Sequence, residues 1–177
     1  MNFTIWRQAV TTMPQLDKSQ WDKLDIIAKW LIATRAPVFL MTLSSAGIGR
    51  LLAWISGSFD LSLFLACAVG LTFAHATNNL LNDFTDSVRG IDKDNYTRNQ
   101  YGIHVLEQGF MSKPEFWRYI AGTGAVALTA GVFLIFERSG ATLMLMLAGA
   151  FFVLFYTWPL KYIGLGEPSV YWYGGHS

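Results

Sequence analysis

Residues 78–92 read Asn-Asn-Leu-Leu-Asn-Asp-Phe-Thr-Asp-Ser-Val-Arg-Gly-Ile-Asp, and they lie where a long apolar segment gives way to a polar one. On a helix, Asn79, Asn82, Asp83 and Asp86 fall at positions i, i+3, i+4 and i+7, so two amides and two carboxylates share one face. Polar side chains at membrane depth are costly and usually face a cavity or a partner. We therefore interpret this face as functional rather than as a solvated helix end.

The acidic residues predict a metal site. Gly90 is a residue at which the helix can end, and Asp92 follows in the turn. Converging carboxylates repel one another unless a hard cation lies between them. Mg²⁺ is commonly held by one or two carboxylates together with phosphate oxygens and water. We expect Asp83, Asp86 and Asp92 to bind Mg²⁺, and the ion to carry a diphosphate.

The composition is that of a membrane protein. Hydrophobic residues make up 53% of the 177 residues, charged residues 14%, and the formal net charge is +1; the mean hydropathy is +0.33. No basic patch with interleaved aromatic residues occurs, so nucleic acid is not an expected partner. Cys67 is the single cysteine, which excludes an internal disulfide. We expect an all-α, polytopic transmembrane bundle in a lipid bilayer.

Four segments approach the roughly 20 apolar residues that a membrane-spanning helix needs, namely residues 37–55, 61–81, 117–136 and 141–156. Arg50 interrupts the first of them and either reaches the far interface or pairs inside the bundle. An apolar restart at residues 169–173 predicts the beginning of a fifth span. We therefore expect residues 36–177 to be the N-terminal part of a longer, truncated transmembrane domain.

Residues 1–35 form a separate N-terminal segment without the central apolar region of a signal peptide. Within it, residues 19–31 predict one short amphipathic helix lying at the membrane interface. Lys and Arg gather in this segment and in the loop at residues 83–115, whereas the turn at residues 56–60 has none. The positive-inside rule then places the aspartate cluster on the cytoplasmic side.

Basic residues on the same side are candidates for binding diphosphate oxygens. They are Arg89, Lys93 and Lys161, of which Lys161 is the strongest because it directly follows the fourth span; Arg98 is expected to be solvated. Membrane topology alone would also place basic residues here. Lys161 is expected to be catalytic together with Asp83 and Asp86.

Two further features are open to a structural or a functional interpretation. His75 lies one turn before Asn79, as a packing residue or as part of a deeper cavity. The polar segment at residues 95–112 is either a plain connector or a lid over the polar site. It ends at Ser112, which together with Glu115 predicts a capped helix start.

These motifs resemble the UbiA superfamily of intramembrane prenyltransferases. The aspartate motif Asn82-Asp83-x-x-Asp86-x-x-x-Gly90-x-Asp92 is similar to the family's first aspartate-rich motif, and its Gly-x-Asp ending to the branch that prenylates 1,4-dihydroxy-2-naphthoate. Three other segments agree with the family: Thr34-Arg35-Ala36-Pro37, Gly109-x-x-Ser112, and the run from Tyr156 to Glu167 that contains Lys161.

The resemblance implies transfer of a prenyl chain from a prenyl diphosphate to an aromatic acceptor, possibly in menaquinone biosynthesis. In that role Asp83 and Asp86 hold Mg²⁺, Asn79 and Asn82 orient them or bind the diphosphate, and Lys161 contacts diphosphate oxygens. The family's later helices and second aspartate-rich motif do not occur in these residues, so we expect the 177-residue chain alone to be inactive.

Three alternatives remain to be weighed. A membrane protein that binds isoprenoid or quinone without catalysis would use the same polar mouth but needs no metal, and an inactive fragment would only insert into the bilayer. Membrane phosphatidyltransferases also place aspartates at a helix end, but their Asp-Gly and Ala-Arg pattern does not occur here.

The expected topology can be tested by labelling. In a Cys67→Ala background, a cysteine introduced as Asn99→Cys should resist a membrane-impermeant thiol reagent in intact cells and react after lysis. Labelling of intact cells would reverse the orientation.

Overall fold

The computed structural model describes residues 3–89, 103–138 and 140–155, and every regular element in them is helical. In chain order the elements are α1 (Phe3–Thr11), α2 (Lys18–Asp22), α3 (Ile26–Ala33), the 3₁₀ turn η1 (Ala36–Val38), α4 (Phe39–Ile55), α5 (Leu61–Arg89), α7 (Lys113–Glu137) and α8 (Ala141–Phe155). The all-α prediction is confirmed.

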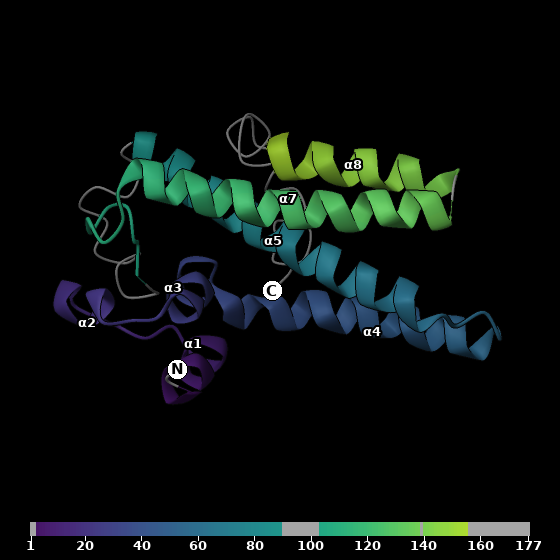
Figure 1. Cartoon of the computed structure of the whole chain (residues 1–177), viewed down its shortest axis with the longest axis horizontal. Helices are drawn as coiled ribbons and strands as arrows, with labels where there is room; N and C mark the ends of the chain where they lie inside the picture. Colours follow the sequence, from purple (N-terminus) through teal and green to yellow (C-terminus); the bar gives the residue numbers. More distant parts are fainter. Residues whose placement is uncertain (1–2, 90–102, 139, 156–177) are drawn as a thin grey trace, which may run out of the picture.

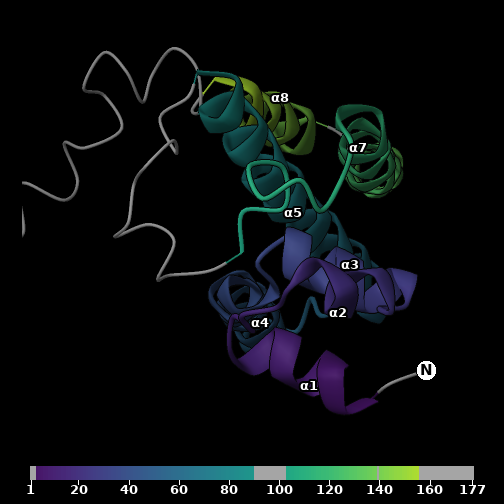
Figure 2. The same ribbon diagram turned by 90° about the vertical axis from the view of Figure 1, so that its left-hand side faces the viewer.

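The four long helices lie roughly along one direction, with α5 crossing between α4 and α7 and with α8 beside α7 (Figure 1). The short helices α1–α3 gather at one end, close to the beginning of α7. Figure 2 looks at the molecule from that end and shows the segment after residue 103 passing in front of α5 on its way to α7. The end of α5 that carries the aspartates is therefore covered by chain from two directions.

Three of the expected spans are confirmed as long apolar helices: Ala36–Ile55, Leu61–Arg89 and Lys113–Glu137. The fourth, α8, has 15 residues in its described part, which is about 22 Å at the α-helical rise. That is short of the roughly 30 Å of a bilayer's hydrocarbon core, so a count of four spans is not confirmed. Residues 169–173, the expected start of a fifth span, lie outside the described residues.

Arg50 lies near the end of α4 that is remote from the aspartates. Its guanidinium sits over the rings of Phe59 and Phe64, 5.4 and 5.5 Å from their centroids. Such cation–π contacts let an Arg remain charged beside apolar surface. The Arg50 side chain therefore extends toward the turn between α4 and α5. This matches the first alternative, in which Arg50 reaches the end of the span, better than pairing inside the bundle.

The single amphipathic helix expected at residues 19–31 is wrong. The chain breaks between α2 and α3, because Asp25 caps the start of α3 by accepting the Ala28 N–H at 2.9 Å. Asp25 also accepts the indole N–H of Trp6 at 2.9 Å. An Asp side chain that bonds to nearby backbone favours a helix start over a helix interior.

The N-terminal helices pack against the segment before α7 and form part of the core. Trp21 is 1% exposed and its ring lies 5.6 Å from that of Phe110, while the Lys18 ammonium donates to the Phe110 carbonyl at 2.9 Å. Other buried members of this cluster come from α5 and α7, namely Leu80, Phe116 and Ile120. We call α1–α3 together with residues 103–112 the cap. Its placement at the membrane interface stays a prediction.

The α5–α7 contact fixes the position of the aspartate helix. The buried hydroxyl of Thr77 donates to that of Thr123 at 2.9 Å, and the two backbones approach closely at Gly70, where an added Cβ would lie 3.1 Å from the Cβ of Ala130. Small residues and hydroxyl bonds of this kind are typical of helix contacts in membranes.

Packing of the cap can be tested with two tryptophans. Trp21→Ala should lower the thermal stability in detergent strongly, because truncation of a buried aromatic side chain typically costs ~3–5 kcal/mol. Trp54→Ala is the matched control, since Trp54 is 63% exposed and its loss should change the midpoint little. Equal shifts in the two variants would contradict the described core.

Candidate functional site

The predicted site residues on α5 share one continuous helix, as the sequence indicated. Both carboxylates are buried, with Asp83 6% and Asp86 1% exposed. Arg89 is the last residue of the helix. Asp92, Lys93 and Lys161 lie outside the described residues, so their predicted roles stay predictions.

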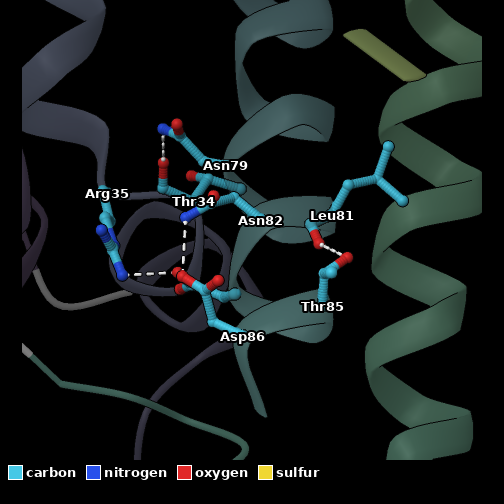
Figure 3. Close-up of polar contacts among 8 residues, drawn as sticks. Thr34, Arg35, Asn79, Leu81, Asn82, Thr85 and Asp86 are labelled. Carbon is cyan, nitrogen blue, oxygen red and sulfur yellow. Dashed lines mark hydrogen bonds and ion pairs between the residues drawn. The ribbon is translucent and has the colours of Figure 1, made fainter. Parts of the chain in front are cut away.

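Asp83 forms an ion pair that the sequence analysis missed. The Arg35 guanidinium donates through Nη2 to Asp83 Oδ1 at 2.5 Å, and Figure 3 shows the Arg35 side chain extending toward α5 from the α3–α4 corner. The two residues are 48 positions apart. No helical spacing links them, and the sequence analysis used Arg35 only for topology and for the family resemblance.

The backbone at Arg35 is held in an unusual conformation. Its φ of 57° and ψ of 54° lie in the left-handed region, and it is the only non-glycine residue with positive φ in the described part of the chain. For an L-residue this conformation costs roughly 1–2 kcal/mol, so the surrounding structure must enforce it. The turn directs the chain from α3 into η1 and places the guanidinium beside α5.

Asn79 helps to hold the backbone at Arg35 in this conformation. Its side-chain nitrogen donates to the Thr34 carbonyl at 2.8 Å, which satisfies a backbone acceptor at the end of α3. The sequence analysis expected Asn79 to orient the carboxylates or to bind diphosphate. The structure places its donor group on the backbone of Thr34.

Asp86 is oriented by its neighbour on the same helix. The Asn82 side-chain nitrogen donates to Asp86 Oδ2 at 3.4 Å (Figure 3), which is a long hydrogen bond. The expected role of Asn82 in orienting the carboxylates or binding diphosphate stays a prediction.

Asn78 is a second residue that the sequence analysis did not single out. Its side-chain oxygen is buried and has no hydrogen-bond partner. Asn78, Asn82 and Asp86 fall at i, i+4 and i+8, so the oxygen lies on the same helix face, one turn deeper than Asn82. A buried unpaired acceptor costs roughly 1–3 kcal/mol, and such atoms need an explanation such as a ligand. The adjacent pair Asn78-Asn79 in an apolar run was the available signal.

Two hollows flank the Arg35–Asp83 pair. The first, about 10 Å³, is mostly apolar and lies between α1, α3 and Ile103, with Arg35 in its lining. The second, also about 10 Å³, is lined by Asp83, Ser87 and residues 104–107. Ile103 thus borders the first hollow, and residues 104–107 border the second.

The described part of the polar segment at residues 95–112 lies against the aspartate helix. The Ser87 hydroxyl donates to a carboxylate oxygen of Glu107 at 3.4 Å, and His104 is buried beside the second hollow. Neither residue was predicted from the sequence. At the other end of the segment, Ser112 caps α7 by accepting the Glu115 N–H at 3.4 Å, as expected.

His75 has a packing role in the described structure. Its Nδ1 lies 2.6 Å from the Thr42 hydroxyl on α4, and its ring meets that of Phe39 edge-on at 5.7 Å. Of the two interpretations of His75, these contacts show the structural one.

The donors present suit a hard cation. Among the described residues no group of three or more His, Cys, Asp or Glu side chains comes together as a metal site. Mg²⁺, however, is usually bound by one or two carboxylates and completed by substrate phosphates and water. Asp83 and Asp86, three positions apart on α5, offer this donor chemistry, so these residues fit the ion.

A comparison with known families identifies the family of this chain. The model of the UbiA prenyltransferase family matches residues 40–175, which include α4, the aspartate helix and everything between α5 and α8. The chain belongs to the UbiA prenyltransferase family. It is an integral membrane protein of that family, and the family's activity is prenyl transfer.

Individual relatives share limited identity with this chain. UbiA prenyltransferase domain-containing protein 1 of Xenopus tropicalis is 35% identical over 81 residues, covering 45% of this chain and 24% of the relative. The 1,4-dihydroxy-2-naphthoate octaprenyltransferase of Escherichia coli (strain K12) is 26% identical over 150 residues, covering 80% of this chain and 48% of the relative. The chain therefore spans less than half the length of these relatives. No solved structure matches it significantly.

The Asn78 oxygen can be tested by substitution. Asn78→Leu should leave the ligand-free UbiA-family protein equally or more stable to heat, since an apolar group replaces an unpaired acceptor. Asn82→Leu, which removes a donor to Asp86, should lower the melting midpoint in the same assay. A comparable loss of stability in Asn78→Leu would show that its oxygen has a structural partner.

Proposed function

We propose that the site transfers a prenyl chain from a prenyl diphosphate to an aromatic acceptor. The observation that carries the proposal is the burial of Asp83 and Asp86 together, at the end of a membrane-spanning helix and beneath a folded cap. Buried carboxylates need positive charge nearby; Arg35 supplies part of it to Asp83, and a metal ion that carries the diphosphate would supply more.

Each group has a role in this chemistry. Asp83 and Asp86 would hold Mg²⁺, Asn82 orients Asp86, and Arg89, Lys93 and Lys161 would contact the diphosphate. Bound Mg²⁺ would neutralise the charge that develops on the leaving diphosphate as the allylic C–O bond breaks. Lys161 would act in the same way from the end of the fourth apolar segment.

The bundle supports the other half of the reaction. The allylic cation must be shielded from water, and apolar helices with a covered mouth provide such an environment. The cap contacts both the aspartate helix and the beginning of α7, so it is positioned to exclude water from the site. The positive-inside distribution supports a cytoplasmic location of this mouth.

For the acceptor we propose a dihydroxynaphthoate, which would place the protein in menaquinone biosynthesis. Support comes from the likeness to the Escherichia coli octaprenyltransferase and from the Gly90-x-Asp92 ending of the aspartate motif.

The proposal can be tested with near-isosteric variants of the gene product in nanodiscs. Asp83→Asn and Asp86→Asn should each abolish Mg²⁺-dependent binding of geranylgeranyl diphosphate and lower prenyl transfer by at least a hundredfold, since each removes a charge that no neighbour replaces.

Asp60→Asn is the matched control. Asp60 lies at the far end of α5, where the Ser62 hydroxyl and then the Leu63 N–H hold the pKa of its carboxyl below the usual value, and its loss should leave binding unchanged. Binding that needs no metal would favour a non-catalytic isoprenoid carrier. Near-normal turnover in either site variant would refute the assigned roles.

A further inference from the structure

We propose that Arg35 is a movable counter-ion: it neutralises Asp83 in the empty site and passes to the diphosphate when a metal ion takes Asp83. This inference rests on the proposed function, and it assigns a diphosphate-binding role to a residue outside the aspartate motif.

The ion pair meets a need of the empty site. The Asp83 side chain is 7% exposed, and an ionised carboxylate at such a position must be paired to remain charged. Arg35 supplies the opposite charge from the corner between α3 and α4.

The same pair blocks loading of the site. Asp83 Oδ1, an oxygen that the metal would use, is occupied by the Arg35 guanidinium. A bound divalent ion and a guanidinium repel each other at contact distance, so Arg35 must leave when the ion binds. An arginine released from a carboxylate has a strong preference for phosphate oxygens, which fit its planar fork.

The surroundings permit a side-chain movement and oppose a backbone movement. The Arg35 backbone is fixed by its left-handed turn, by Pro37 in η1, and by the Asn79 bond to the Thr34 carbonyl. The Arg35 side chain is 27% exposed and borders the first hollow, so part of it already lies outside the packed core. The exchange therefore needs only rotation of side-chain torsions.

The proposal makes two predictions of opposite sign. Removing Arg35 should strengthen metal binding in the absence of diphosphate, because the competitor for Asp83 is gone. It should weaken diphosphate binding at saturating metal, because a cation for the diphosphate is lost. A purely structural ion pair would weaken both, since its loss would disorder the site.

The test uses the gene product in nanodiscs, with Mn²⁺ as a spectroscopic substitute for Mg²⁺. Free Mn²⁺ is measured by electron paramagnetic resonance without diphosphate, and geranylgeranyl diphosphate binding is measured calorimetrically at saturating Mg²⁺. Arg35→Gln should tighten Mn²⁺ binding at least threefold and weaken diphosphate binding at least tenfold. Arg50→Gln, at the remote end of α4, is the matched control and should change neither affinity.

The outcomes separate the two proposals. If wild type binds no metal–diphosphate, the proposed function fails. If wild type binds it and Arg35→Gln has unchanged diphosphate affinity or weaker Mn²⁺ affinity, the counter-ion role is overturned while the function stands. If Arg35→Gln does not fold, Arg35→Lys decides: it keeps the charge without the fork and should weaken diphosphate binding a few-fold without weakening Mn²⁺ binding. Unchanged diphosphate affinity in Arg35→Lys would overturn the proposal.

Discussion

Two buried carboxylates at the end of a membrane-spanning helix are the constraint on which the surrounding structure depends. Asp83 and Asp86 cannot remain charged there without partners. Arg35 meets Asp83 from the α3–α4 corner, and Asn82 donates to Asp86 from the same helix. The left-handed turn at Arg35 and the Asn79 bond to Thr34 support this ion pair, because they fix the corner from which the guanidinium reaches α5.

The cap contributes much of the packed core, whereas the long helices expose apolar side chains. The well-packed core of the described residues lies at the aspartate end, where Trp21, Phe110 and Phe116 join the N-terminal helices to α5 and α7. Large apolar side chains along α4 and α8 are exposed instead, as expected for surfaces that meet lipid. A rigid cap over a charged mouth, with an apolar bundle behind it, suits a reaction that needs both a bound diphosphate and exclusion of water.

The sequence by itself determined the elements and the chemistry of the motif. Apolar length predicted three helices that are long and apolar enough to span a membrane. The 3.6-residue period placed Asn79, Asn82, Asp83 and Asp86 on one helix. Both signals are local. The amphipathic pattern at residues 19–31 was misleading, because the capping tendency of Asp25 ends one helix and begins another there.

Only the tertiary structure decided what the motif touches. The Arg35–Asp83 pair joins residues 48 positions apart, and the Lys18 bond to Phe110 joins residues 92 apart. No periodicity encodes such contacts, because they arise from how helices pack against one another. For the same reason the unpartnered oxygen of Asn78 and the position of His104 beside Asp83 could be found only in the folded chain.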